Sequence, residues 1–409
     1  MSRPAPAGIV IAGGGIGGLA TALALQARGL RATVLEAAPE ISPLGVGINI
    51  QPAAVAELIG LGLGDALAAT AIPTREHRYL NSRGDTLWTE PRGVAAGHAA
   101  PQYSIHRGEL QMMLLDAVRA RLRQDAVRTG IQVRGFAHSG DRVQVRTRTQ
   151  SGAETTVEAD VLLGADGLHS AVRAQLHPDE PPVRTTIVRM WRGLTELPEF
   201  LDGLTMIIAS DEQANRIVAY PCSRRHAERG AVLLNWVCLA ADPRWQGEAP
   251  DGPGRLEDLL PYFEHWDFGW LDIRATFAAC PEVLHYPMVD RDPLPSWGEH
   301  RTTLLGDAAH PMYPIGANGA SQAILDGVAL AAELAHDGDA PAALRRYEDV
   351  RRPATTAIVH ANRTMDRSER ALAERPGGDV SGELQAITSD YRATVERSQA
   401  LPAAHRAQP

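Results

Sequence analysis

Residues 9–36 read IVIAGGGIGGLATALALQARGLRATVLE, and this stretch decides the fold class. It begins with an apolar run at 9–11, followed by a glycine turn at 13–18. An Ala- and Leu-rich segment at 19–28 has the composition of a helix, and a second apolar run stands at 32–35. A strand, a turn, a helix and a second strand within about 30 residues predict a βαβ unit, and therefore a parallel sheet.

The glycine turn has the GxGxxG spacing of dinucleotide-binding folds. Gly13 permits the tight turn, Gly15 lets the backbone approach a pyrophosphate, and Gly18 lets the helix pack on the strand. The helix N-terminus presents free N–H groups to phosphates. Glu36 ends the second strand, where a carboxylate would accept hydrogen bonds from both hydroxyls of an adenosine ribose. A glycine turn that binds nothing is the alternative, and the strand, the helix and Glu36 together disfavour it.

The residue composition and the expected secondary structure of the remaining chain change twice. A second helix is expected from about Ser104, and the strands that follow it are expected at 131–133, 142–148 and 161–163. Six of the seven tryptophans lie between Trp191 and Trp297, a region of short strands. These strands are expected at 186–191, 205–209, 217–220 and 232–238. After an apolar run at 302–305, a helix is expected from about Ala320 to His336, and the tail from Pro341 is helical and rich in Arg and Glu.

These patterns predict an α/β protein. A Rossmann-like nucleotide-binding domain is interrupted by a mainly antiparallel β-sheet domain for the substrate, and a helical segment ends the chain. The expected boundaries are 1–73, 101–183 and 287–338 for the nucleotide-binding domain, 74–100 and 184–286 for the substrate domain, and 339–409 for the C-terminal helices.

The composition excludes several classes of function. All 40 basic residues are Arg, so the chain has neither a lysine for a Schiff base nor the lysine of a Walker P-loop. Three cysteines without a CxxC pair disfavour a disulfide framework and a thiolate zinc site, and they suit the cytoplasm. The net charge of −9, with no basic stretch and no run of 18 apolar residues, indicates neither a nucleic-acid partner nor a membrane partner. HExxH and GxSxG are absent, and no metal site is expected.

Three further motifs identify the dinucleotide. They are HRGEL at 106–110, GADGLHSAVR at 164–173 and GDAAHP at 306–311. With the glycine turn, their order and spacing make the chain resemble the group A flavin monooxygenases of the p-hydroxybenzoate hydroxylase fold over nearly its whole length. The resemblance implies a GR2-type FAD-binding domain, non-covalent FAD, NAD(P)H as a transient co-substrate, O2, and a planar aromatic substrate.

The resemblance also implies roles for single residues. Glu36 would hold the adenosine ribose, and Arg107 would contact FAD near its pyrophosphate. Asp307 would bind the ribityl or pyrophosphate part, and Asp166 belongs to a motif implicated in FAD and NAD(P)H binding. A solvated Arg107, a helix-capping Asp307 and a purely structural Asp166 are the alternatives. The full set of expected cofactor-binding residues is Gly13, Gly15, Ile16, Gly17, Gly18, Glu36, Ala37, Val46, Gly47, Arg107, Asp166, Asp307, Gly316, Gly319 and Ala320.

The segment PIGANGA at 314–320 is expected beside the flavin. Its glycines let the backbone approach the pyrimidine edge, and the helix from about Ala320 would point its positive end there. Reduced flavin is negatively charged at that edge, so the helix dipole favours reduction. Ala317 and Asn318 depart from the pattern of many relatives, which leaves the contacts of this loop open.

The substrate pocket is predicted from side chains on the strands. Five of them are expected on one sheet face, with core packing as the alternative for each: Trp191, Met206, Ile208, Tyr220 and Trp236. Tyr313 and Pro314, beside the flavin loop, are better candidates. Arg192 is a candidate for binding a carboxylate, with a structural ion pair as the alternative. No catalytic side chain is assigned, because the chemistry would belong to the flavin.

Four longer stretches carry a closer resemblance, to the phenazine-modifying flavin hydroxylases. They are LGVGINIQPAAVAEL at 44–58, PQYSIHRGELQM at 101–112, YPMVDRDPLPSWG at 286–298 and the segment 304–327. The resemblance implies decarboxylative hydroxylation of a phenazine-1-carboxylate to a hydroxyphenazine through a flavin C4a-hydroperoxide. A salicylate-like hydroxylase and a flavin-binding protein without turnover are the alternatives. The choice between NADH and NADPH, a homodimer and the role of the tail stay open.

Overall fold

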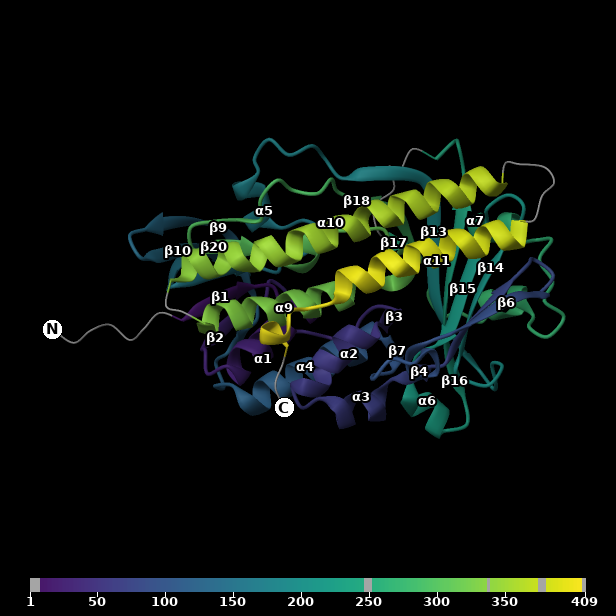
Figure 1. Cartoon of the computed structure of the whole chain (residues 1–409), viewed down its shortest axis with the longest axis horizontal. Coiled ribbons are helices and arrows are strands. Elements are labelled where there is room, and N and C mark those ends of the chain that lie inside the picture. Colours follow the sequence, from purple (N-terminus) through teal and green to yellow (C-terminus); the bar gives the residue numbers. More distant parts are fainter. Residues whose placement is uncertain (1–7, 246–251, 337–338, 374–379, 407–409) are drawn as a thin grey trace.

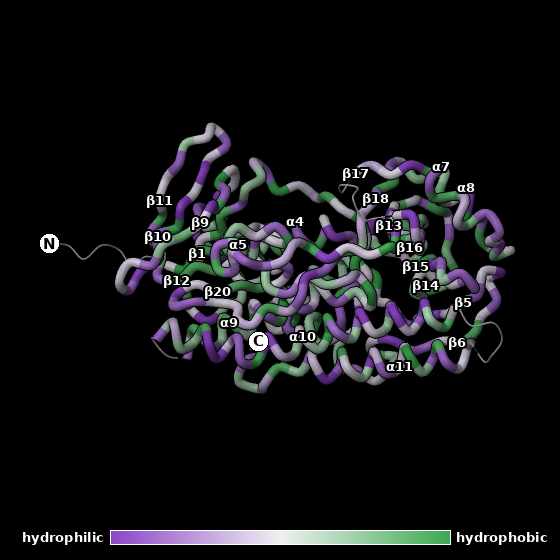
Figure 2. Tube along the Cα trace, turned by 90° about the horizontal axis from the view of Figure 1, so that it is seen from above, coloured by the Kyte–Doolittle hydropathy of each residue, from purple (hydrophilic) through white to green (hydrophobic). Residues whose placement is uncertain are grey.

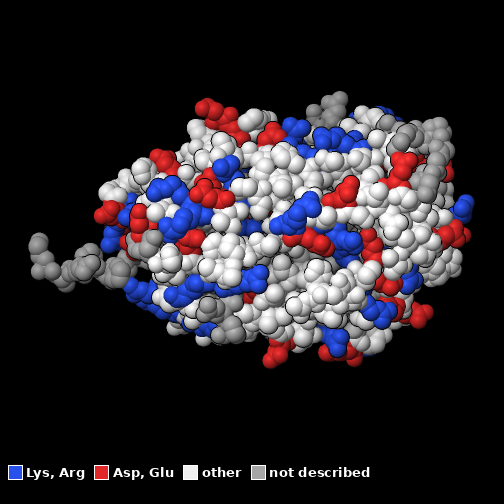
Figure 3. Space-filling view, in the orientation of Figure 1, with Lys and Arg blue, Asp and Glu red and all other residues white. Residues whose placement is uncertain are grey.

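The computed structural model describes residues 8–245, 252–336, 339–373 and 380–406. The parallel sheet around β1 lies at one end of the molecule, and a large second sheet lies at the other (Figure 1). The long helix α10 runs along both parts, and α11 lies beside it over the part with the second sheet (Figure 1). No helix in the described ranges combines the length and apolarity that crossing a bilayer requires. On the face drawn in Figure 3, acidic and basic side chains are interspersed, without a broad area of one sign.

The first sheet contains the predicted βαβ unit. Its six strands have the order β19-β20-β12-β1-β2-β8, and β1 pairs in parallel with both β2 and β12. The strands are β1 (Ile9–Ala12), β2 (Ala32–Leu35), β8 (Val127–Arg128), β12 (Val161–Gly164), β19 (Gly298–Glu299) and β20 (Thr302–Leu304). Helix α1 (Ile16–Ala27) joins β1 to β2 and begins inside the glycine turn, three residues before the expected Leu19.

Helix α9 (Gly319–His336) packs across α1 in the core of this half. The two helices approach closely because Gly327 carries no side chain: a Cβ there would lie 2.5 Å from the hydroxyl oxygen of Thr21. That hydroxyl in turn donates to the carbonyl of Gly17 at 2.7 Å. Because α9 begins at Gly319 and ends at His336, the expected helix from Ala320 to His336 is correct to one residue.

Two small antiparallel sheets flank this half. One has the order β11-β10-β9 and the other β3-β7-β4. The strands are β3 (Gly47–Ile50), β4 (Ile72–Thr74), β7 (Gln102–His106), β9 (Ile131–Ser139), β10 (Arg142–Thr149) and β11 (Glu154–Ala159). The expected helix start at Ser104 is wrong, because Ser104 lies within β7 and its hydroxyl donates to Asn49 Oδ1 at 2.7 Å. Helix α4 (Arg107–Arg121) begins three residues later, capped by His106.

The second large sheet has eight strands, in the order β17-β18-β13-β16-β15-β14-β5-β6. Every neighbouring pair is antiparallel except β14 with β5. The strands are β5 (Glu76–Leu80), β6 (Thr86–Pro91), β13 (Arg184–Leu197), β14 (Thr205–Ser210), β15 (Arg216–Pro221), β16 (Val232–Ala241), β17 (Gly252–Pro253) and β18 (Leu284–Asp290). The mainly antiparallel sheet is confirmed. The boundaries of the units stay a prediction, and β18 extends to Asp290, beyond the expected 286.

The C-terminal helical segment is also confirmed. Helix α10 (Ala340–Ala373) contains Pro353, and α11 (Val380–Gln399) packs against it. Hydrophilic and hydrophobic residues alternate along both helices (Figure 2), as expected for helices with one buried side. The shorter helices are α2 (Pro52–Gly60), α3 (Gly64–Thr70), α5 (Ala171–Leu176), α6 (Arg224–Glu228), α7 (Leu256–Leu259) and α8 (Ile273–Ala278), with single turns at 93–96, 260–262, 306–308, 315–317 and 403–405.

Candidate functional site

A cavity of about 920 Å³ lies between the two halves of the molecule. One end is walled by the glycine turn, β3 and the segment 305–320, and the other by one face of the eight-stranded sheet. Helices α10 and α11 contribute side chains along its length. Its volume is at the upper end of the range for small-molecule sites, as expected where a cofactor and a substrate share one space.

The glycines of the turn serve different purposes. Gly13 has φ +106°, and a Cβ there would lie 2.3 Å from the carbonyl oxygen of Ala165. A Cβ on Gly18 would lie 2.0 Å from the carbonyl oxygen of Gly13, so these two glycines shape the backbone and do not line the cavity. Gly15 has open space at its Cβ position and lines the cavity, together with Ile16 and Gly17. The turn therefore presents bare backbone to a ligand.

Glu36 lies against this turn. Its two carboxylate oxygens accept hydrogen bonds from the backbone N–H groups of Gly14 and Ala38, both at 2.7 Å. Like Ala37 and Val46 it does not line the cavity, whereas Gly47 does. The carboxylate is thus held at the carboxyl end of β2, next to the turn.

Arg107 and Asp307 both line the cavity. Arg107 begins α4, and its side chain packs on Gly45, where a Cβ would lie 3.3 Å from Arg107 Cδ. Asp307 is exposed toward the cavity, although protein encloses it on the other sides. That enclosure raises the pKa of the Asp307 carboxyl, while His310 and Arg107 lower it.

Asp166 points away from the cavity. Its carboxylate accepts hydrogen bonds from the Ser170 hydroxyl at 2.5 Å and from the Ala171 N–H at 2.8 Å, at the start of α5. Burial raises the pKa of Asp166, and the Ser170 hydrogen bond lowers it. Among its neighbours, Ala165 and Gly167 line the cavity through their backbone positions. This geometry supports the structural alternative for the carboxylate itself.

A buried ionic cluster holds the turn that carries Asp307. Asp326, on α9, accepts hydrogen bonds from the Gly306 N–H at 2.9 Å and from Arg351 Nε at 2.8 Å, and it pairs with His310 Nε2 at 2.6 Å. Burial raises the pKa of Asp326, but His310 and Arg351 outweigh it and hold the value at about 2. His310 does not line the cavity, so its contacts are those of a supporting residue.

The expected flavin loop is tied to the C-terminal helix α11. Gly316 and Ala317 have φ of +68° and +52°, so both lie in the left-handed region. The buried hydroxyl of Tyr391 lies 3.0 Å from the carbonyl oxygen of Ile315 and 2.6 Å from Asn318 Nδ2. A Cβ on Gly316 would lie 2.2 Å from this hydroxyl, so only glycine fits there. Gly316, Gly319, Ala320, Tyr313 and Pro314 all line the cavity.

The sheet face toward the cavity differs from the prediction at two positions. Arg192, Met206, Ile208 and Tyr220, which were predicted as pocket residues, line the cavity, and their contact with a substrate stays a prediction. They are joined by unpredicted side chains: Met190, Val218, Val237 and Leu239.

Trp191 and Trp236 were assigned to the wrong face, because they lie in the core on the opposite side of the sheet. Neighbouring residues of a strand point to opposite faces, so Arg192 in the cavity requires Trp191 on the other side. Trp236 lies over Gly193, where a Cβ would meet its ring at 2.2 Å, and its Nε1 donates to Thr195 Oγ1 at 3.0 Å.

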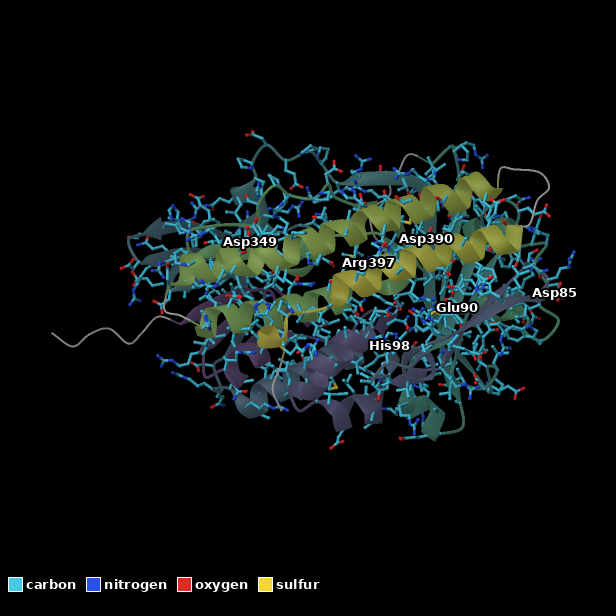
Figure 4. All side chains as sticks on the ribbon, viewed as in Figure 1. Asp85, Glu90, His98, Asp349, Asp390 and Arg397 are labelled. Carbon is cyan, nitrogen blue, oxygen red and sulfur yellow. The ribbon has the colours of Figure 1, made fainter. Side chains whose placement is uncertain are left out.

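Sequence reasoning missed the far end of the cavity. It is lined by His77, Tyr79, Gln102 and Arg216 from the strands, by Arg92 directly after β6, and by Thr388, Tyr391, Arg392, Val395, Glu396 and Gln399 from α11. Figure 4 shows Glu90 and His98 beside α11; Arg392 lies 3.7 Å from Glu90, and His98 lies 3.9 Å from Glu396. Burial, with Arg92 and Arg392 nearby, lowers the pKa of His77, so its ring is neutral at pH 7. No motif marks α11, and only its alternation of polar and apolar residues hinted at a buried side.

The residues present fit FAD. The turn offers bare backbone at Gly15, and the Glu36 carboxylate lies at the end of β2. The exposed Asp307 and Arg107, which forms no ion pair with a described residue, line the cavity. Within the described ranges, no group of three or more His, Cys, Asp or Glu is arranged to hold a metal ion.

Comparison with known proteins agrees with this geometry. A family model described as FAD binding domain matches residues 7–253 and 280–362. The chain is 59% identical over 404 residues to phenazine 1,6-dicarboxylic acid hydroxylase PhzS of Lysobacter antibioticus, covering 97% of this chain and 99% of that one.

Solved structures share the fold. HpxO of Klebsiella pneumoniae, complexed with FAD and uric acid, has a TM-score of 0.75 at 26% identity, covering 95% of this chain and 92% of that one. A salicylate hydroxylase substrate complex has a TM-score of 0.76 at 21% identity, covering 98% and 100%. The chain therefore belongs to the FAD binding domain family, and it is an FAD-dependent monooxygenase that hydroxylates aromatic compounds.

Proposed function

We propose that this enzyme converts a phenazine-1-carboxylate type of substrate into a hydroxyphenazine, with loss of the carboxylate and with NAD(P)H as the electron donor. The observation that carries the proposal is the 59% identity, over nearly the full length, to a hydroxylase whose name gives phenazine 1,6-dicarboxylic acid. The cavity supports it, because its sheet face is broad and largely apolar, as a flat three-ring substrate requires.

The overall reaction balances as follows. NAD(P)H supplies two electrons, one atom of O2 becomes the new hydroxyl, and the other becomes water. A carbon–oxygen bond forms at the ring carbon that bears the carboxylate, and the bond to the carboxylate breaks. The carboxylate leaves as CO2, and the electron pair of the broken bond restores the aromatic ring.

The residues of this chain bind, orient and exclude water. We propose that the glycine turn, Glu36, Arg107 and Asp307 hold FAD, with Gly316 and Gly319 presenting backbone to its ring. When bound, FAD would accept the two electrons of NAD(P)H and activate O2. Met206, Ile208 and the other apolar side chains of the sheet face would hold the substrate ring, and α11 would close the cavity against water.

The test is product analysis under ¹⁸O2. The purified flavoprotein is incubated with NADH or NADPH and, in separate reactions, phenazine-1-carboxylate, phenazine-1,6-dicarboxylate and salicylate. The expected product has lost CO2 and gained one ¹⁸O atom, with NAD(P)H oxidation stimulated by the phenazine. Turnover of salicylate without turnover of either phenazine would favour the salicylate-like alternative. Bound FAD with no substrate-stimulated NAD(P)H oxidation would favour the non-catalytic alternative.

We also propose that the enzyme works in the cytoplasm without a nucleic-acid or membrane partner. A homodimer stays a prediction, and light scattering of the purified flavoprotein tests it.

A further inference from the structure

The arginines that line the cavity divide into two groups. They are Arg92, Arg107, Arg192, Arg216 and Arg392. Three of them have carboxylate partners: Arg92 lies 3.8 Å from Glu90, Arg392 lies 3.7 Å from Glu90, and Arg216 pairs with Glu369. Arg107 and Arg192 form no ion pair with any residue that the structure describes.

The two unpaired arginines come from different halves of the molecule, and Arg107 is close enough to lower the pKa of Arg192. Arg107 is in the nucleotide-binding half, where it packs on Gly45 and lowers the pKa of Asp307. Arg192 is on β13, in the sheet wall expected to contact the substrate, and its register partner on β16 is Val237. Two neighbours of Arg192 on this wall, Met190 and Val237, are apolar, and the polar side chain of Tyr220 lies beside it. Arg192 is thus a cation without a carboxylate partner among the described residues, in a largely apolar wall.

The guanidinium of Arg192 has unused donors. Its Nη2 donates to the carbonyl of Gly47 at 2.8 Å, whereas its Nε is buried without a hydrogen-bond partner. Burial lowers the pKa of Arg192, and the side chains of Tyr220 and Tyr286 raise it. Arginine nevertheless stays protonated in proteins, so this wall carries a positive charge. A buried charge without a counter-charge is costly, and an anionic ligand would remove that cost.

We propose that Arg192 binds a carboxylate of the aromatic substrate and so selects carboxylated over neutral ring systems. The inference rests on the proposed function, because it takes the occupant of the sheet wall to be an aromatic acid. The planar guanidinium carries several N–H donors in a geometry that matches the two oxygens of a carboxylate. Tyr220 beside it lines the same wall.

The experiment compares two ligands with the same ring system, phenazine-1-carboxylate and unsubstituted phenazine, in the FAD-loaded enzyme without NAD(P)H. Binding is followed by the change in flavin absorbance, and the affinity for FAD is measured separately. Arg192→Gln should weaken binding of the carboxylate by about 10- to 100-fold, the range expected for a lost charge-assisted hydrogen bond, and change phenazine binding less than about threefold. Arg119→Gln, at an exposed position of α4, is the control for the change in net charge.

Two results would overturn the proposal. If R192Q weakens the binding of both ligands equally, Arg192 has a structural role in the sheet. If it weakens FAD binding and leaves both ligand affinities unchanged, Arg192 serves the cofactor. If R192Q does not fold, Arg192→Met fills a similar volume in the apolar wall and removes the same charge. Binding and turnover by the wild-type enzyme distinguish a failure of this inference from a failure of the proposed function. A wild type that binds but does not hydroxylate the phenazine acid contradicts the function alone. A wild type that hydroxylates it, with an unchanged ligand preference in the variant, contradicts the inference alone.

Discussion

Tyr391→Phe removes one hydroxyl that ties helix α11 to the loop expected beside the flavin. The hydroxyl accepts a hydrogen bond from Asn318 Nδ2 at 2.6 Å. It can donate its single proton to Asn362 Oδ1 at 2.7 Å or to the carbonyl oxygen of Ile315 at 3.0 Å. Tyr391, Asn318, Asn362 and Ile315 are all buried.

The expected loss of unfolding free energy follows from the polar groups that lose their hydrogen-bond partners. Asn318 keeps one hydrogen bond, since its Oδ1 accepts from Gln399 Nε2 at 3.2 Å, and Asn362 Nδ2 keeps its bond to the Tyr313 carbonyl at 3.2 Å. Asn318 Nδ2 and Asn362 Oδ1 are left unsatisfied. With about 1–3 kcal/mol for each buried unsatisfied group, partly relieved by relaxation, the expected loss of unfolding free energy is about 2–4 kcal/mol.

The assay is urea unfolding of the flavoprotein at a fixed excess of FAD, because bound ligand shifts the apparent stability. FAD affinity should fall as well, since the left-handed backbone at Gly316 and Ala317 loses its support. The control is Tyr103→Phe, whose hydroxyl makes no hydrogen bond to any described residue. A Y391F variant within about 0.5 kcal/mol of Y103F, with wild-type FAD affinity, would refute the reasoning.

Three further outcomes follow from the nucleotide-binding half. Gly18→Ala places a Cβ 2.0 Å from the Gly13 carbonyl oxygen, so the variant should purify without flavin, and full flavin content would contradict the proposed role of the turn. Glu36→Gln should weaken FAD binding by about tenfold, or about 1.4 kcal/mol, in a titration of the apoprotein, and unchanged affinity would remove Glu36 from the site. Asp326→Asn should lower the unfolding free energy by about 3–5 kcal/mol at pH 7, because it leaves Arg351 without its buried counter-charge and removes the carboxylate that pairs with His310. Since the pKa of Asp326 is lowered from 3.8 to about 2, its stabilisation is fully present above pH 4 and is lost as the pH falls toward 2. D326N should therefore flatten the loss of stability between pH 4 and pH 2, and an acid-unfolding profile parallel to the wild type would contradict this assignment.

The sequence alone determined the features that depend on neighbours along the chain. The strand, turn, helix and strand of residues 9–36 were predictable because their hydrophobic pattern and glycine spacing span one supersecondary unit. The positive φ of Gly13 and the close backbone contacts at Gly13 and Gly18 exclude any side chain, and the sequence has glycine at both positions. The order of motifs along the chain likewise identified the family, because each motif is a short segment with its own local geometry.

Only the tertiary structure decided which sheet face meets the cavity and what closes it. Alternation along β13 separates Trp191 from Arg192, but it does not say which of the two sides is covered by α7 and α8. The glycine at 193 makes room for Trp236, and only the pairing of β13 with β16 brings those two residues together. The start of α4 depended in the same way on the pairing of Ser104 with β3. Tyr391 reaches a loop that precedes it by more than 70 residues, and no local pattern encodes that contact. Faces, pairings and long-range closure arise from packing between distant segments, which is why the cavity could be read only from the folded chain.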